Sequence, residues 1–309
     1  MITKIKYKDH TEWLEVRSKY LGGSDSASVV GMNPYKSMYS LWAEKTNKVP
    51  AFEGNLTTEV GSYLEEFVAK LFEKETGKKV RKCNYTMVND KYPFACANVD
   101  RLIVGEDALL EIKTTNSLPT MKKCKNGEFP DAWYAQMTHY LSVLELKKAY
   151  LAVLVNCREF YIFELERDED EINALMKAEA DFWNNYVLTN TPPMADGTDS
   201  TSETLKTIYP ESNGETVSLM AFESDLEQYM TLSSLLDDVK KQKEEVANKI
   251  KGYMQEASKG ECNGFKVSWS SSVRSTFDHK AFAKDNPGID LSGYYKETPT
   301  RTFKVNEIK

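Results

Sequence analysis

The chain lacks several features that would each place it in a specialised class of protein. It has no apolar run of the roughly 18 residues that a transmembrane helix needs, so we expect no membrane span. The N-terminal ten residues lack the apolar stretch of a signal peptide, and no secretory leader is expected. The net charge of −7 argues against a surface coated with basic charge, although it leaves room for a local basic groove around nucleic acid.

Cysteine is also scarce, and its pattern argues against two kinds of metal site. The five cysteines are odd in number, widely separated and never spaced as CxxC: Cys83, Cys96, Cys124, Cys157 and Cys262. We therefore expect free thiols in a reducing, cytoplasmic compartment, with neither a zinc site nor an iron–sulfur cluster.

The rest of the sequence alternates helical and strand patterns. With 41% hydrophobic and 28% charged residues, its composition is typical of a globular protein. Spacing and capping residues predict helices over 13–20, 24–30, 38–46, 57–76, 133–144 and from 168 to about 186. Strands are predicted over 80–88, 94–104, 108–114, 148–156 and 159–165. This order predicts an α/β fold with a mixed central sheet flanked by helices.

A change of composition near residue 191 predicts a domain boundary. The following segment is rich in Pro, Ser, Thr and Gly, so we expect a domain over 1–191, a linker over 192–221 and an accessory region over 222–309. The accessory region begins with a predicted helix over 222–257, whose apolar residues alternate three and four apart as in a packing or oligomer seam. A small β unit is expected after it, with strands near 265–270 and 301–305.

The residues most suggestive of chemistry lie on two neighbouring strands. Glu111 and Lys113 share one face of a strand, because alternate residues point the same way, while Ile112 points into the core. Asp100 precedes a short hairpin over 105–107, and pairing across it can bring its carboxylate beside that of Glu111. Two close carboxylates repel each other unless a cation lies between them, and oxygen ligands favour Mg²⁺ or Mn²⁺. A surface hairpin with an ordinary Glu/Lys pair is the alternative, but the apolar flanks favour a buried site.

Five short segments, taken in order, form a larger pattern. They are Trp13-xxx-Arg17 with Gly22-Gly23-Ser24-Asp25, Gly61-xxx-Glu65, Asp100 with Glu111-x-Lys113, Gln136-xxx-Tyr140, and Phe182-Trp183 to Pro192-Pro193. In these segments the sequence resembles the PD-(D/E)XK nuclease superfamily over roughly residues 10–193, specifically the YqaJ-type viral recombinases and lambda-type alkaline exonucleases. The resemblance implies a restriction-endonuclease-like core.

The resemblance also implies a role for each residue of the nuclease core. Asp100 and Glu111 would bind a divalent metal, Mg²⁺ or Mn²⁺, with the carbonyl of Ile112 as a further ligand. Lys113 would activate the attacking water. Glu65 would be a second-metal ligand or would orient the water.

The other segments of the resemblance imply contacts with the substrate. Gln136 would hold the active site or the scissile strand, and Tyr140 is a further candidate in the same segment. Arg17 and Ser24 resemble a pocket for a 5′-phosphate. The residues themselves support this pocket, because Gly22-Gly23-Ser24 at a helix start offers backbone N–H groups to an anion, and an arginine adds a bidentate charge.

The resemblance implies a Mg²⁺-dependent deoxyribonuclease of phage-type recombination in a bacterial or phage-infected cell. It would digest the 5′ strand of linear duplex DNA and leave a 3′ single strand for an annealing protein. Related enzymes form ring-shaped trimers, which implies a homo-oligomer. Two alternatives stay open: a structure-specific or nicking endonuclease on the same core, and an inert DNA-binding recombination scaffold.

Overall fold

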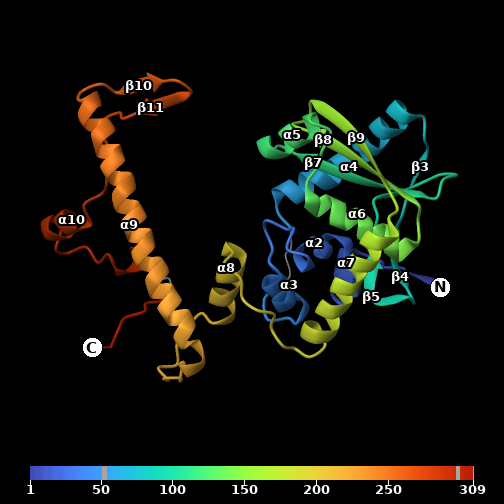
Figure 1. Ribbon diagram of the computed structural model, residues 1–309, viewed down its shortest axis with the longest axis horizontal. Coiled ribbons are helices and arrows are strands. Elements are labelled where there is room, and N and C mark those ends of the chain that lie inside the picture. The colour runs from blue at the N-terminus through green and yellow to red at the C-terminus, as the bar shows by residue number, and fades with distance from the viewer. Residues whose placement is uncertain (51–53, 297–299, 309) are drawn as a thin grey trace. The chain divides into compact units, whose positions relative to one another are not determined.

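The computed structural model describes residues 1–50, 54–296 and 300–308. The chain divides into two compact units, Met1–Tyr209 and the part from Pro210 onward (Figure 1). Within the described residues, no helix is both long enough and apolar enough to cross a membrane.

The first unit is built around a five-stranded mixed sheet. Its strand order is β3–β6–β7–β8–β9, in which β7 and β8 are parallel and all other neighbours are antiparallel. The strands are β3 (Val80–Lys82), β6 (Arg101–Ile103), β7 (Ala108–Thr115), β8 (Lys148–Val155) and β9 (Glu159–Glu166). The prediction of an α/β fold with a mixed sheet flanked by helices is confirmed for this sheet.

A second, four-stranded sheet was not predicted. Its order is β1–β4–β5–β2, with β2 and β5 parallel. The strands are β1 (Ile2–Ile5), β2 (Leu21–Gly22), β4 (Thr86–Asn89) and β5 (Tyr92–Ala97). The expected single strands over 80–88 and 94–104 are each two strands in different sheets.

Side-chain hydrogen bonds explain where these two strands break. Asn98 Nδ2 donates to Thr86 Oγ1 at 2.9 Å and to the Tyr85 carbonyl at 3.4 Å. Asp100 Oδ2 accepts from the backbone N–H of Ile112 at 2.7 Å. Polar side chains thus take backbone partners that a continuous ladder would use, and the chain passes from one sheet to the other at this point.

Helices cover both faces of the five-stranded sheet. On one face lies α4 (Leu56–Thr76), which begins at an Asn55 cap and ends at Gly77 with φ 71°. Its Val68 and Phe72 pack against Leu110 of β7. The other face is covered by α6 (Asp131–Leu144) and α7 (Glu169–Phe182), which continues into a π-helical turn at Trp183–Val187.

Three helices of the first unit come from the N-terminal part of the chain. Helices α1 (His10–Ser18), α2 (Gly23–Val29) and α3 (Met38–Lys45) lie where the sequence predicts helices. Leu21, Trp42 and Phe182 form a separate apolar cluster beneath them. Helix α5 (Leu118–Lys125) was missed, although Ser117 at its N-cap and Pro119 in its first turn are ordinary start signals.

The predicted linker over 192–221 contains a helix, so that boundary requires correction. Helix α8 (Asp199–Ile208) packs on α3, and the compact unit extends to Tyr209. The contact is made by hydroxyl groups: Thr201 Oγ1 donates to Ser37 Oγ at 2.8 Å and Thr204 Oγ1 to Ser40 Oγ at 2.7 Å. The Ser and Thr residues of this segment, whose composition predicts a loop, instead cap α8 and attach it to α3.

The second unit consists of a long helix, a hairpin and a tail. Helix α9 (Glu223–Met254) is followed by a hairpin of β10 (Lys259–Cys262) and β11 (Phe265–Ser268), then by α10 (His279–Asp285). The expected strand over 301–305 is wrong. That segment is irregular, and its Phe303 packs edge-to-face on Tyr229 of α9, while β11 pairs with the unpredicted β10.

Candidate active site

The side chains of strand β7 point alternately to the two faces of the five-stranded sheet. Leu110 and Ile112 belong to the apolar cluster that contains Val68 and Phe72 of α4. Glu111 and Lys113, one residue out of phase, face the opposite layer and reach Gln136 on α6. The predicted alternation along 111–113 is therefore confirmed, and it follows from the two-residue period of a strand.

Three side chains form a closed hydrogen-bonded group on this face. Gln136 Nε2 donates to Glu111 Oε1 at 2.7 Å, and Lys113 Nζ donates to Gln136 Oε1 at 2.8 Å. Lys113 Nζ also lies 2.9 Å from Glu111 Oε1. Gln136 in turn donates to the hydroxyl of Tyr140 at 3.1 Å. The structure thus brings four of the sequence-predicted residues together.

Asp100 lies beside this group. Its Oδ2 accepts the hydrogen bond from Ile112 N, which fixes the carboxylate next to β7. Burial raises the pKa of Asp100 well above its usual range, and the negative charge of Glu111 raises it further, while Lys113 opposes the shift. The Asp100 and Glu111 carboxylates are therefore close enough for the charge of Glu111 to disfavour ionisation of Asp100, as expected from the sequence.

The arrangement fits a divalent cation held by few ligands. Glu111 is only 3% exposed, and its second oxygen, Oε2, has no hydrogen-bond partner within the described residues. A buried, unpaired carboxylate oxygen is costly, and a cation beside Asp100 would relieve both that cost and the repulsion. Across the described part of the chain, no three or more His, Cys, Asp or Glu side chains are grouped to hold an ion by themselves. Main-chain oxygen or water would have to complete the shell.

Glu65 is engaged by an arginine that sequence reasoning missed. Arg101, 2% exposed, bonds Glu65 and the neighbouring Glu66, the latter at 3.0 Å, and donates to the Asp100 carbonyl at 2.7 Å. Glu65 is thus close enough to raise the pKa of Asp100 but is already neutralised by an ion pair. In the sequence, Arg101 could have been noticed as a basic residue directly after Asp100.

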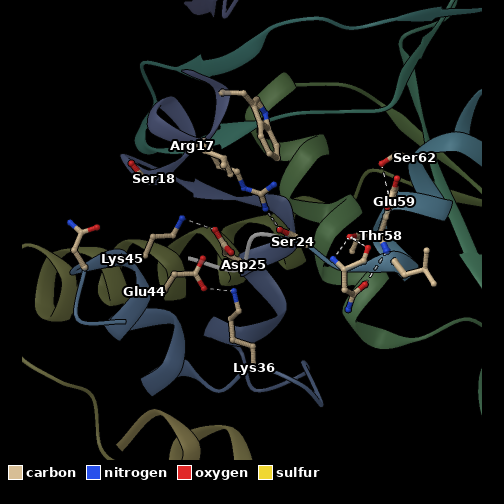
Figure 2. A pocket seen from close by; sticks show the side chains of 16 residues that line it. Arg17, Ser18, Ser24, Asp25, Lys36, Glu44, Lys45, Thr58, Glu59 and Ser62 are labelled. Carbon is tan, nitrogen blue, oxygen red and sulfur yellow. Dashed lines mark hydrogen bonds and ion pairs between the residues drawn. The ribbon is translucent and has the colours of Figure 1, made fainter. Parts of the chain in front are cut away.

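A cavity of about 780 Å³ lies between α1, α2, α3 and the first turns of α4, and it contains both residues of the predicted phosphate pocket (Figure 2). Arg17 donates to the hydroxyl of Ser24 and stacks on Trp13, with 5.1 Å from its guanidinium carbon to the ring centroid. Burial alone would lower the pKa of Arg17, but the charge of Asp25 raises it above its usual value. Arg17 therefore keeps its positive charge in the wall of this cavity.

Two charged residues in the cavity wall were not predicted to belong to the site. Lys45 Nζ lies 2.9 Å from Asp25 Oδ2, and Asp25 also accepts from the N–H of Gly22 at 3.1 Å. Burial would raise the pKa of Asp25, but Lys45 and Arg17 hold it far below its usual range. The pair fixes the start of α2 beside Ser24, as Figure 2 shows.

Comparison of the sequence with known proteins finds a matching family and several similar proteins. The profile of the YqaJ-like viral recombinase domain matches residues 12–147. The uncharacterised protein YqaJ of Bacillus subtilis strain 168 is 36% identical over 313 residues, covering 100% of this chain and 98% of that protein. Protein D345L of African swine fever virus is 38% identical over 79 residues, which cover 25% of this chain and 21% of that protein.

Solved structures share the fold. An alkaline exonuclease from Laribacter hongkongensis, LHK-Exo, superimposes with a TM-score of 0.52 at 19% identity, covering 59% of this chain and 94% of the enzyme. Its complex with dAMP gives a TM-score of 0.50 at the same identity and coverage. At this identity the likeness establishes a common fold.

Proposed function

The chain belongs to the YqaJ-like viral recombinase family, and we propose that it is a Mg²⁺-dependent deoxyribonuclease acting on the ends of linear duplex DNA. It would remove nucleotides from the 5′ strand and leave a 3′ single strand for an annealing protein. The observation that carries the proposal is the group formed by Asp100, Glu111, Lys113 and Gln136, in which one buried carboxylate oxygen has no partner in the described structure.

Asp100, Glu111 and the carbonyl of Ile112 would hold the cation, with Mn²⁺ as a substitute for Mg²⁺. The cation supplies positive charge that offsets the negative charge of the scissile phosphate. Glu65 would bind a second metal ion, or orient the attacking water, only by leaving Arg101, because the two form an ion pair.

Lys113 would act on the attacking water and on the developing phosphate charge. Its ammonium is held by Glu111 and by Gln136, which removes much of the freedom of a long side chain before the substrate arrives. Gln136 bonds both Glu111 and Lys113, so it would hold the metal-binding carboxylate and the ammonium in a fixed relative position.

Arg17 and Ser24 would bind the terminal 5′-phosphate. They lie in one cavity, carry a charged guanidinium and an exposed hydroxyl, and adjoin the start of α2, where backbone N–H groups favour an anion. The dAMP bound to LHK-Exo, which has the same fold, supports a site for a nucleoside monophosphate.

The test is degradation of end-labelled DNA with and without Mg²⁺. We expect metal-dependent release of nucleotides from linear duplex, faster from 5′-phosphorylated than from 5′-hydroxyl ends, and no cutting of a covalently closed circle. Nicking of the circle would favour an endonuclease instead. Absence of both cleavage and Mg²⁺ or Mn²⁺ binding by calorimetry would favour an inert DNA-binding scaffold.

A further inference from the structure

Helix α9 carries an apolar seam that the other described residues of the second unit leave uncovered along most of its length. Tyr229, at one end, packs on Phe303. From there the seam continues at alternating spacings of three and four residues, with aliphatic side chains between 43% and 59% exposed: Leu232, Leu236, Val239, Val246 and Ile250. Lys243 occupies the one polar position, and Tyr253 ends the series. An apolar stripe of this kind on a 32-residue helix is typical of an interaction surface.

The charge of α9 is divided between its two halves. Residues 223–238 contain five acidic side chains and no basic one, whereas residues 239–254 contain five lysines and two glutamates. Two such helices side by side in the same direction would set acid against acid and lysine against lysine. In opposite directions, each acidic half would lie along a basic half, so the helix is complementary to an inverted copy of itself.

Lys243 gives a second reason for an inverted arrangement. In a parallel pair or trimer in register, the Lys243 ammonium groups would meet within the seam, which costs stability. In an antiparallel pair centred near residue 241, Lys243 instead faces Val239 of the second copy. There its aliphatic stem can cover the valine while the ammonium reaches water.

We propose that α9 is a self-association surface whose occupant is the α9 helix of a second copy of this chain, bound antiparallel. The seam then closes in symmetric layers, Leu232 on Ile250, Leu236 on Val246 and Val239 on Lys243, each taken across the two copies. The like charges closest to the twofold axis belong to Lys240, and each is already paired with Asp237 of its own helix at 3.2 Å. Nothing in this pairing depends on nuclease activity.

The first test is the concentration dependence of the mass of the full chain, measured by sedimentation equilibrium without DNA. We expect association that Leu236→Glu weakens at least tenfold, because the change places charge in the seam of both copies. Ser234→Glu, which adds the same charge on the outer face of the helix, should leave it unchanged. A wild type that stays monomeric at all concentrations would overturn the proposal, as would an oligomer that Leu236→Glu leaves unaffected.

Cross-linking tests the direction of the helices. Ser233 and Ala247 flank the seam so that each faces the other only across an antiparallel pair. With the exposed Cys157 and Cys262 replaced by serine, Ser233→Cys and Ala247→Cys variants are oxidised separately and as a mixture. Disulfide-linked dimers should form in the mixture and hardly at all in either sample alone. Equal yields in the mixture and in the separate samples would rule out the antiparallel seam.

Discussion

Gly23 lies so close to the ring of Tyr140 that a Cβ atom on Gly23 would come within 2.5 Å of Tyr140 Cε1. Gly23 begins α2 and precedes Ser24 of the cavity, while the hydroxyl of Tyr140 accepts a hydrogen bond from Gln136. The Tyr140 ring therefore lies between the proposed phosphate pocket and the proposed hydrolytic group. The ring fits there because Gly23 has no side chain.

Gly23→Ala should therefore damage both stability and cleavage. The added methyl group must displace the buried ring, and overpacking of this kind typically costs about 1–3 kcal/mol of unfolding free energy. Moving the ring also disturbs Gln136, so turnover should fall more than DNA binding. Urea denaturation and single-turnover cleavage measure the two effects.

Gly61→Ala is the matched control for that substitution. A Cβ on Gly61 would lie 3.5 Å from Thr114 Oγ1, an ordinary contact, and the residue lies inside α4. Alanine there should be neutral or should stabilise by up to about 1 kcal/mol, because glycine is a poor helix former. Equal damage from both substitutions, or none from Gly23→Ala, would show that the Tyr140 contact does not matter.

A second prediction concerns Lys113. Replacing it by Ala should lower turnover by orders of magnitude with little change in DNA affinity, because its ammonium is proposed to act mainly in the transition state. Lys113→Arg should rescue only partly, since a guanidinium fork does not fit where Glu111 and Gln136 hold a point charge at 2.9 and 2.8 Å. Separate measurements of kcat and of DNA binding decide the matter, and equal losses in both would make Lys113 a simple phosphate contact.

The sequence could predict the parts of the site that depend on short-range periodicity. Glu111 and Lys113 share a face because strand residues alternate, and the apolar neighbours of β7 show that the face is buried. The break between the two sheets could not be predicted, because it depends on Asn98 bonding a residue twelve positions away. The Arg101–Glu65 pair joins residues 36 positions apart, so only the folded arrangement of α4 against β6 brings them together.

A third prediction concerns the end preference. A charge-assisted contact between Arg17 and a phosphate is worth roughly 1.5–3 kcal/mol, or about ten- to hundredfold in rate. Arg17→Ala should slow cleavage of 5′-phosphorylated ends by that factor and leave 5′-hydroxyl ends almost unchanged, since Asp100 and Glu111 are untouched. Ser18→Ala is the control, because Ser18 lines the same cavity but donates back to the Glu15 carbonyl.

This comparison should be made at fixed salt, because contacts with phosphate weaken as salt rises. If Arg17→Ala slows both kinds of end equally, the residue supports the structure of the cavity and does not read the phosphate. If the wild type ignores the end phosphate, the pocket is misassigned.

The last prediction concerns a buried ion pair behind the site. Nε2 of His139 donates to the Cys96 carbonyl at 2.9 Å, and Nδ1 lies 2.9 Å from Glu179 Oε1, to which it donates when the ring is protonated. An imidazole that donates from both nitrogens is charged. Burial lowers the pKa of His139, but the charge of Glu179 outweighs it and raises the pKa above the usual value.

This pair should make the stability of the protein depend on pH in a definite direction. Because the folded pKa of His139 is raised, its contribution is complete below the unfolded value of about 6.5 and is lost as pH rises through the folded value. The unfolding free energy of the wild type should therefore decline above about pH 6.5. In Glu179→Gln the counter-charge is gone, and burial, which lowers the pKa, is opposed only by the smaller effects of the Cys96 carbonyl and the charge of Asp25. The pKa of His139 should then fall below its usual value, and the contribution should instead be lost as pH falls. Urea denaturation between pH 5.5 and about 8.5, with His139→Gln to remove the titrating group, measures the slope of each variant. The same slope in wild type and Glu179→Gln would mean that another group, and not this pair, governs the pH dependence.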